Sequence, residues 1–585
     1  DSIFITRVND FKIVENKIYA ATNFGAFIYD VVNKQIHKYN SHSNDVNSLS
    51  SDLVRNIHYS KSSNYLWLTI MNAGVDVINL SNNKILHINI NNAKEYGIEY
   101  ENYFNILEDK DKNIWLGGYD ITKYDPNKRK FGLLANNYPK DFNLGFTDVW
   151  GTFIDSKGHL WLGEYVPHMG IMEVDRSKNT KKRYLQDPSS TNVRTWKFSE
   201  DSKGNIFAFC SSPNGILFFK KIFGKNNFIL QGLLKEKTKI SDNSSLGYTY
   251  LNNKQELIYT GEKPIILSNS NGDTSYKALP LPSNLKGGII LVKRKSKNEL
   301  YILNNDGLFI LNEDTNTAVS LNGKLSFPRE HDLWMDMEIV DDKYLFLVTY
   351  GNGLIKVDLQ KNTKTFLTLA EGIPSLYLYN IYKGNNNNLW MSSNFGIIRY
   401  NPSTNKFRSF GPSDGVQDFE FNSNSASQSK DREIFFGGTK GLNYFFPDSI
   451  KENQNKPVVI IQSSDPKQEF NVKYNENNLS FDFLAFNFRD AEHNLYAYKM
   501  EGYDQDWVNS GSRRFASYTN LHEGTYTFRV KAANNDGIWN EEGAKMVIHI
   551  LPPPWRTWWA YLFYIIGSIS LIYSFSKYRE KQQFK

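Results

Sequence analysis

The sequence has one cysteine, Cys210, among 585 residues. A single thiol cannot form an internal disulfide, and a cysteine-rich zinc site needs several thiolate ligands. The chain also lacks a concentrated block of one charge, because its net charge of +6 is spread over 68 basic and 62 acidic residues. Without a basic block or an acidic tail, nothing in the sequence favours nucleic acid as a partner.

Sequence motifs that carry catalysis are absent as well. The chain contains no Cys-x-x-Cys, His-Glu-x-x-His, Walker loop or Gly-x-Ser-x-Gly elbow, and its 10 histidines are scattered. The glycine-rich stretch 437–441 does not have the spacing of a phosphate-binding loop, and we interpret it as a turn. We therefore expect no catalytic residue, no metal site and no cofactor in this chain.

Long helical periodicity is missing before residue 555, and an internal repeat is found instead. The clearest unit runs from Asn105 to Asp125 and contains an apolar run, a turn rich in Asp, Asn and Lys, and then Trp115-Leu-Gly-Gly. The same pattern returns around three further aromatic residues and, more weakly, around four others: Trp161, Phe207 and Trp390, then Trp67, Tyr259, Tyr301 and Phe346. We count about ten units, separated by about 42 to 52 residues.

Each unit is interpreted as a four-stranded blade. Short runs rich in Ile, Leu, Phe and Tyr between clusters of Gly, Asn and Asp are typical of strands joined by tight turns. Several such strands at this period indicate a β-propeller, which protects its sheet edges by radial closure. We assign residues 1–150 to a partial N-terminal propeller and 151–447 to a complete, seven-bladed second propeller, with the repeated aromatics as interblade core.

The C-terminal part has a different pattern. Residues 457–551 contain apolar runs that alternate in period two, which fits an immunoglobulin-like β-sandwich. Residues 557–576 are an uncharged stretch of 20 residues, which is long enough to cross a bilayer as one helix. Trp558 and Trp559 lie at one end of this stretch. Lys and Arg residues within 577–585 predict a cytoplasmic C-terminus, with everything before residue 557 outside. The fold class is therefore all-β, followed by a single transmembrane helix.

One block carries a family resemblance. The stretch from Tyr496 to Trp507, its continuation through Tyr518 and Tyr526, and the Pro-Pro-Pro-Trp555 exit resemble the three-tyrosine domain that follows two-component-regulator propeller repeats. The blades resemble those repeats, and together the two similarities cover nearly the whole chain. The resemblance implies the periplasmic sensor region of a hybrid two-component system of the Bacteroidetes type, anchored in the inner membrane.

The same resemblance implies the partners. Such receptors commonly detect oligosaccharides in the periplasm and signal to a histidine kinase or another output domain. We therefore expect an oligosaccharide or other small periplasmic ligand, a homodimer, and no catalytic activity in this chain; kinase activity would belong to a missing C-terminal part. Relatives carry about fourteen repeats in two seven-bladed propellers. We expect that N-terminal blades and the output domain lie outside the present sequence.

Ligand-binding candidates come from one repeat position. Eleven residues before the second-strand aromatic, several units carry another aromatic, whereas Asn56 and Ile290 break the pattern. This position begins the innermost strand, so it should ring one mouth of the propeller, where concave surfaces bind ligands. Together with arginines in the entry segments, these residues form the predicted ligand site: Trp150, Trp196, Tyr248, Trp334, Tyr379, Arg194 and Arg329. The alternatives are interblade packing for the aromatics and a solvated surface role for the arginines.

Two other functions stay open. Asp155-Ser-Lys-Gly158-His-Leu-Trp161 resembles a turn of sialidase-like propellers, which leaves a propeller glycosidase or lyase as an alternative. That turn is a structural hairpin, and a glycosidase needs two carboxylates about 5 to 10 Å apart across a cleft. A structural or adhesive membrane-anchored propeller is the other alternative.

Overall fold

The computed structural model describes most of the chain. It covers residues 7–583 apart from 43–44, 46, 91–99, 126–129, 136–143, 146–147, 166–169, 185–192, 201–203, 213, 222–227, 234–248, 252–255, 260–264, 269–276, 280–281, 286–288, 297, 305, 313, 322–333 and 463–468. The chain divides into two compact units, one formed by residues 1–126 with 452–585 and the other by residues 127–451. The residues predicted to line the mouth of the propeller and to bind a ligand all belong to the second unit.

The first three repeats form three antiparallel sheets, each with its strands in chain order. They are β1 (Val8–Val14), β2 (Lys17–Thr22), β3 (Gly25–Asp30) and β4 (Gln35–Tyr39); β5 (Val54–Ser60), β6 (Tyr65–Ile70), β7 (Gly74–Asn79) and β8 (Lys84–Ile88); and β9 (Tyr103–Glu108), β10 (Ile114–Gly118) and β11 (Ile121–Tyr124). These sheets have the form of propeller blades.

Six four-stranded blades follow in the second unit. They are β13 (Val149–Ile154), β14 (Leu160–Glu164), β15 (Gly170–Asp175) and β16 (Thr180–Tyr184); β17 (Arg194–Glu200), β18 (Ile206–Ser212), β19 (Asn214–Lys221) and β20 (Phe228–Leu233); β21 (Thr249–Leu251), β22 (Glu256–Tyr259), β23 (Ile265–Ser268) and β24 (Lys277–Leu279); β25 (Ile289–Ser296), β26 (Glu299–Asn304), β27 (Gly307–Asn312) and β28 (Thr317–Ser320); β29 (Trp334–Val340), β30 (Tyr344–Thr349), β31 (Leu354–Asp358) and β32 (Thr363–Leu367); and β33 (Leu378–Lys383), β34 (Leu389–Ser393), β35 (Gly396–Asn401) and β36 (Lys406–Phe410).

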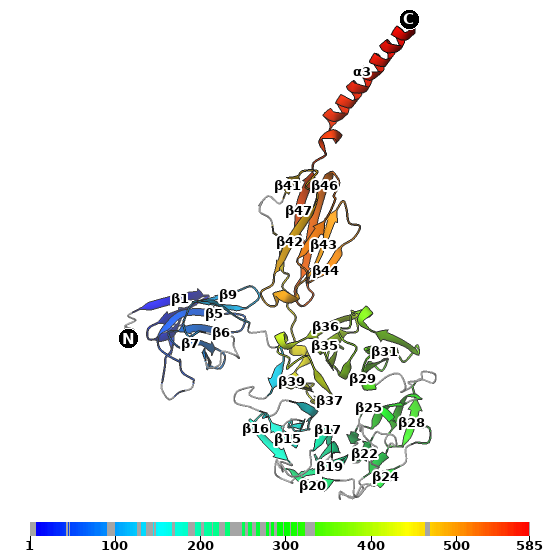
Figure 1. Ribbon diagram of the computed structural model, residues 1–585. Helices are drawn as coiled ribbons and strands as arrows, with labels where there is room; N and C mark the ends of the chain where they lie inside the picture. The colour runs from blue at the N-terminus through cyan, green and yellow to red at the C-terminus, as the bar shows by residue number, and fades with distance from the viewer. Residues whose placement is uncertain are drawn as a thin grey trace. The chain divides into compact units, whose positions relative to one another are not determined.

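The seventh blade closes the ring with strands from both ends of the unit. β37 (Phe421–Gln428), β38 (Ile434–Gly438) and β39 (Gly441–Phe445) are completed by β12 (Gly132–Leu134), which pairs antiparallel with β39. In Figure 1 these sheets are arranged radially, from cyan through green to yellow. The division between the units falls at 126/127, before the predicted boundary at 150/151, because β12 is the outer strand of the closing blade and carries no repeat signature.

Interblade packing buries the repeated second-strand aromatic. Trp161 and Phe346 are fully buried, and Trp390 is 1% exposed within a cluster that also contains Phe131, Phe410 and Phe445. The preceding turn is built on Asp155, whose carboxylate accepts hydrogen bonds from the backbone N–H of Lys157 and His159, each at 2.9 Å, and from Trp161 Nε1 at 3.2 Å. Gly158 completes the turn at φ +86°, a conformation that favours glycine.

The C-terminal domain is a sandwich of a three-stranded and a five-stranded sheet, in the orders β40-β42-β45 and β41-β47-β46-β43-β44. The strands are β40 (Val458–Ile461), β41 (Glu469–Val472), β42 (Leu479–Phe486), β43 (Leu495–Glu501), β44 (Val508–Gly511), β45 (Phe515–Tyr518), β46 (Gly524–Ala533) and β47 (Trp539–Ile550). Tyr518 and Tyr526 belong to its core, whereas Trp507 lies at the surface beneath the Lys531 ammonium group, 4.6 Å from the ring centroid.

The sandwich is followed by helix α3 (Trp558–Gln583), which Figure 1 draws in red. By length and composition α3 can cross a membrane, and it is the one such helix among the residues that the structure describes. Nearly all of its apolar side chains are exposed, as expected for a helix whose natural surroundings are lipid. The predicted fold class, with propeller blades, a sandwich and one membrane-type helix, is confirmed.

We predict that Asp155→Ala lowers the free energy of unfolding by about 1 to 3 kcal/mol, because three donors lose their acceptor in a largely buried turn. Lys157→Ala in the same turn keeps the backbone N–H and should change stability little. Urea denaturation followed by fluorescence measures both variants. Equal stability of Asp155→Ala and the parent would contradict the role given to this turn.

Candidate functional site

The repeat position singled out in the sequence is a β-bulge. In β13 the pairing steps from Val149 with Glu164 to Gly151 with Gly163, so Trp150 has no partner across the ladder. The same irregularity occurs in the innermost strands of other blades, where it leaves these residues unpaired in the ladder: Phe104, Trp196, Ile290, Met335 and Tyr379. A bulge bends the strand and changes the direction of its side chains. The recurring geometry explains why the position recurs at a fixed spacing.

Trp150 and Trp196 come together with Tyr165, which follows β14. The rings of Trp150 and Tyr165 are stacked with centroids 4.0 Å apart at 11°, and the centroids of Trp150 and Trp196 are 4.3 Å apart. The Arg194 guanidinium lies 5.5 Å from the Tyr165 ring centroid. We call Trp150, Tyr165, Trp196 and Arg194 the mouth cluster. All four side chains are half-buried.

The mouth cluster holds two hydrogen-bond donors that have no acceptor in the described part of the chain. Trp150 Nε1 donates to the Asp148 carboxylate at 3.0 Å. Trp196 Nε1 and Arg194 Nε, in contrast, are buried atoms without a hydrogen-bond partner among the described residues. Because buried donors are rarely left unsatisfied, these two donors require a partner, which a water molecule or a polar ligand could supply.

Trp334 and Tyr379 have a different environment. Trp334 is 8% exposed in the core between neighbouring blades and lies one residue before the bulge, which falls on Met335. Tyr379 is buried in another interblade cluster, and its hydroxyl donates to Glu420 Oε1 at 2.7 Å. Burial and this carboxylate raise the pKa of the Tyr379 hydroxyl. The structure therefore brings together Trp150, Trp196 and Arg194, whereas Tyr248 and Arg329 lie outside the described residues.

Four exposed aromatics near this end were missed in the sequence. The ring centroids of Tyr350 and Tyr377 are 5.0 Å apart, and those of Phe395 and Phe419 are 5.5 Å apart. Their exposed fractions lie between 41% and 48%. Each pair joins the turn between a blade's second and third strands to the segment that enters the next blade. Of the four, Phe395 carries a sequence signal, because it directly precedes Gly396, the glycine that opens the third strand of its blade.

These pairs lie at the same end of the propeller as the mouth cluster. In an antiparallel blade, the turn between the second and third strands and the segment entering the first strand share one end of the sheet. The closing blade connects the two groups, because Asn422 Nδ2 of β37 donates to Asp148 Oδ1 at 2.7 Å and to the Val149 carbonyl at 2.9 Å. We call Tyr350, Tyr377, Phe395 and Phe419 the rim pairs.

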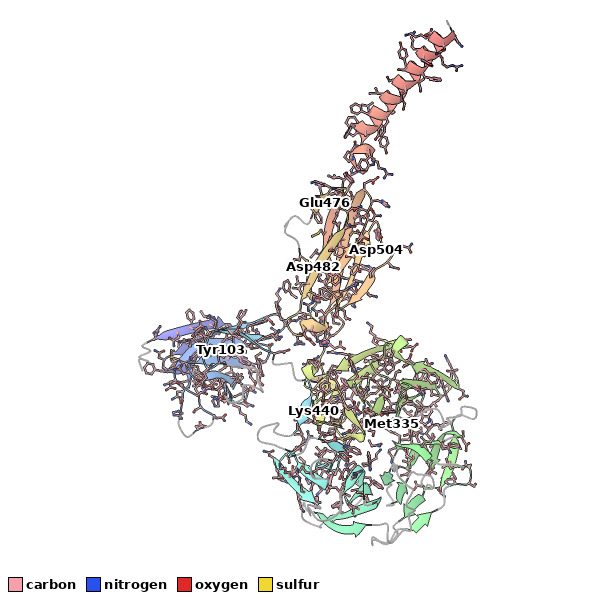
Figure 2. The ribbon with its side chains drawn as sticks, in the orientation of Figure 1. Tyr103, Met335, Lys440, Glu476, Asp482 and Asp504 are labelled. Carbon is pink, nitrogen blue, oxygen red and sulfur yellow. The ribbon has the colours of Figure 1, made fainter. Side chains whose placement is uncertain are left out.

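Carboxylates near the rim are already engaged. Glu420 accepts a hydrogen bond from the Tyr379 hydroxyl. Asp418 Oδ2 lies 2.7 Å from Nζ of Lys440, which is on the turn between β38 and β39 and is labelled in Figure 2. Among the described residues, no three His, Cys, Asp or Glu side chains are grouped to hold a metal ion. The chemistry that the mouth offers is stacking combined with hydrogen bonding.

Charged residues also gather along the innermost strands. Lys293 Nζ of β25 lies 2.9 Å from Glu338 Oε2 of β29 and 4.8 Å from the Tyr382 ring centroid. Burial lowers the pKa of Lys197 in β17 to about 8, with the nearby charge of Asp336 opposing this shift and that of Lys293 adding to it. The centre of the propeller is therefore polar and cationic in part.

Comparisons with known proteins give the same architecture. Residues 487–551 match the model of the Y_Y_Y domain family. The chain is 26% identical over 542 residues to histidine kinase P4 of Formosa agariphila, covering 87% of this chain and 36% of that protein. It thus spans about a third of the relative's length.

Among solved structures, the chain is similar to the extracellular domain assigned to a hybrid two-component system of B. thetaiotaomicron, with a TM-score of 0.60, 17% identity, and 94% and 92% of the two chains covered. The chain therefore has the fold of that extracellular domain, and its C-terminal sandwich matches the Y_Y_Y domain. A second B. thetaiotaomicron extracellular domain, assigned to a one-component system, aligns over 93% of this chain and 81% of that chain, with 16% identity and a TM-score of 0.41.

The lowered pKa of Lys197 gives the stability of this protein a specific pH dependence. The unfolded chain holds the lysine proton up to about pH 10.5, whereas the folded state releases it near pH 8. Between these values the unfolded state binds more protons, so raising the pH stabilises the folded state. We expect the parent to gain about 1 to 3 kcal/mol relative to Lys197→Met between pH 8 and pH 10.

Chemical denaturation at several pH values measures this difference, with Lys440→Met, an exposed lysine, as the control. A constant difference between the parent and Lys197→Met across the pH range would show that Lys197 titrates normally.

Proposed function

We propose that this chain is the periplasmic, ligand-sensing part of a receptor anchored in the inner membrane by α3. Its ligand is an oligosaccharide bound at the propeller mouth, and its output is a kinase or transcriptional domain beyond this chain. The observation that carries the proposal is the mouth cluster, where Trp150 stacks on Tyr165 beside the unsatisfied donors Trp196 Nε1 and Arg194 Nε.

A sugar suits this combination of groups. The faces of a pyranose ring carry C–H bonds that pack on aromatic rings, while its hydroxyl and carboxylate groups accept hydrogen bonds. Exposed aromatic faces with a few placed donors therefore bind a sugar better than either a wholly apolar or a highly charged ligand. Arg194 would favour a sugar that carries an acidic group.

The rim pairs support an extended ligand. Facing sheets are about 10 Å apart, so equivalent positions on successive blades are separated by roughly the length of a disaccharide. Tyr350 with Tyr377 and Phe395 with Phe419 occupy equivalent positions one blade apart. An oligosaccharide that begins in the mouth cluster could continue over the rim pairs.

Transmission to the membrane requires movement of rigid parts. The propeller core is closely packed, so ligand binding is expected to change the arrangement of domains or of subunits in a homodimer, without deforming the blades. A ligand can drive such a change only by binding one arrangement more tightly than another. Lys577, Arg579 and Lys581 after the apolar stretch favour a cytoplasmic C-terminus.

The alternatives have weaker support. A glycosidase needs two free carboxylates across a cleft, whereas Asp148, Asp418 and Glu420 each have hydrogen-bond or ion-pair partners within the propeller. A purely adhesive propeller does not account for the unsatisfied donors of the mouth cluster.

Isothermal titration calorimetry of the detergent-solubilised chain tests the proposal. The ligands are di-, tetra- and hexasaccharides from a neutral β-glucan and from a uronate-containing glycan. We expect about micromolar binding of one class. Trp150→Ala should weaken binding of every length about tenfold or more, because it removes the central stacking surface. Phe395→Ala should weaken binding of the hexasaccharide and leave the disaccharide unchanged.

Phe446→Ala is the matched control, since Phe446 is equally exposed but follows β39 at the opposite end of the blade. It should leave every affinity unchanged. Absence of binding by all members of both series would overturn the oligosaccharide proposal. Binding that is insensitive to Trp150→Ala would place the site elsewhere.

A further inference from the structure

One end of the sandwich gathers the segments next to α3. β41 runs parallel to β47 with Val472 opposite Ile550, and β46 begins with Gly524 opposite Ile550. The loop after β41, the loop before β46 and the segment leading to α3 therefore share one end of the domain. Glu476, in the first of these loops, is labelled at this end in Figure 2.

Two aromatic side chains meet at this end. The rings of Tyr474 and Trp555 are in edge-to-face contact, with centroids 5.2 Å apart at 75°. Trp555 is 55% exposed and Tyr474 is 37% exposed, so both offer apolar surface and a polar atom to the surroundings. Neither side chain is needed to fill the sandwich core.

Polar contacts fix the exit segment to the sandwich. Arg556 Nη1 donates to Glu523 Oε1 at 2.5 Å, directly before β46. The short 3-10 turn Pro554–Arg556 is joined to the helix by Thr557 Oγ1, which donates to the Pro554 carbonyl at 2.7 Å, and by Tyr564 Oη, which donates to the Trp555 carbonyl at 3.3 Å. Tyr474, Trp555 and Arg556 are thus held close to the first turn of α3.

The short segment between Trp555 and α3 determines how deep Trp555 and Tyr474 lie in a bilayer that α3 crosses. Trp555 precedes Trp558, the first residue of α3, by three residues, and two 3-10 steps of about 2 Å with one extended step of about 3.3 Å correspond to about 7 Å. The headgroup layer on each side of a bilayer is about 5 to 8 Å thick. If α3 spans the membrane from Trp558, Trp555 lies within this layer, and Tyr474 reaches it through its contact with Trp555.

Charges at this end are balanced. Lys473 lies 3.8 Å from Glu476, and Arg556 is paired with Glu523, which gives two cations and two carboxylates. Such a surface complements zwitterionic phospholipids, whose headgroups carry both charges, and has no preference for anionic lipid. Aromatic residues with a polar atom are the side chains that partition into this layer.

We propose that this end of the sandwich is a lipid-binding surface, in which Tyr474 and Trp555 insert among the headgroups of zwitterionic phospholipids. The inference rests on α3 as the membrane span of the proposed function. The sandwich then has two attachments to the bilayer, the helix and the loop of Tyr474, and its tilt relative to the membrane is restricted. A rearrangement of the domains that precede the sandwich in the chain would then be transmitted to α3 and would not be absorbed by a flexible linker.

Spin labels in the full chain reconstituted into phosphatidylethanolamine and phosphatidylcholine nanodiscs test this surface. One label is placed by Glu476→Cys at the proposed surface, one by Glu492→Cys at the opposite end of the sandwich, and one by Ile569→Cys within α3. The native thiol of Cys210 is buried, and burial raises its pKa to about 12, so it should not react with the label.

The measurement is the collision rate of each label with an aqueous nickel chelate and with oxygen. We expect the label at 476 to collide with the nickel chelate several-fold less than the label at 492, in low and in high salt. The double variant Tyr474→Ala with Trp555→Ala should raise the nickel collision rate at 476 to that at 492. Both side chains are exposed, so the sandwich should fold in this variant, which the unchanged value at 492 verifies.

Equal nickel accessibility at 476 and 492, with the label at 569 protected from nickel and exposed to oxygen, would overturn the lipid-binding surface and leave the span intact. A water-exposed label at 569 would instead overturn the span and with it this inference. Loss of protection at 476 in high salt would show a charge-driven contact and contradict the aromatic insertion.

Discussion

Face-to-face burial between blades is the constraint on which the rest of the propeller depends. Each four-stranded sheet exposes two faces that are covered only by its neighbours, so the ring is stable when it closes, and β12 closes it by pairing with β39. The large repeated aromatics, such as Trp161 and Trp390, are buried in this packing and are not accessible to a ligand. The side chains left for a ligand are therefore those at strand ends, in turns and at bulges.

This constraint explains what the sequence could and could not predict. Strand runs, the Asp155 turn and the repeated aromatics are local signals, and they were sufficient to predict blades, sandwich and helix. The spacing that selected Trp150 and Trp196 is the spacing of a β-bulge. This backbone feature recurs where the innermost strand of a blade pairs with the second strand of the same blade. Spacing alone did not separate these residues from Trp334 and Tyr379, which have similar chemistry but are buried between blades.

The remaining differences also have physical causes. β12 contributes only three residues to a blade whose other strands follow almost three hundred residues later, so no local pattern marks it, and the predicted boundary at 150/151 differs from the observed division. The rim pairs form between a turn of one blade and the entry segment of the next. Such a contact depends on the packing of two successive blades, and a search for a single repeated position could not find it.

The central claim is that this protein binds a ligand at the end of the propeller where the bulges and the rim pairs lie. Hydrogen exchange of the full chain, with and without the uronate and β-glucan hexasaccharides, tests this most directly, because backbone amides report on every segment at once. The account predicts slower exchange at the start of β13 and β17 and around Phe395 and Phe419, with no change at the Asp155 turn on the opposite end. Protection confined to the opposite end or to the sandwich would contradict it.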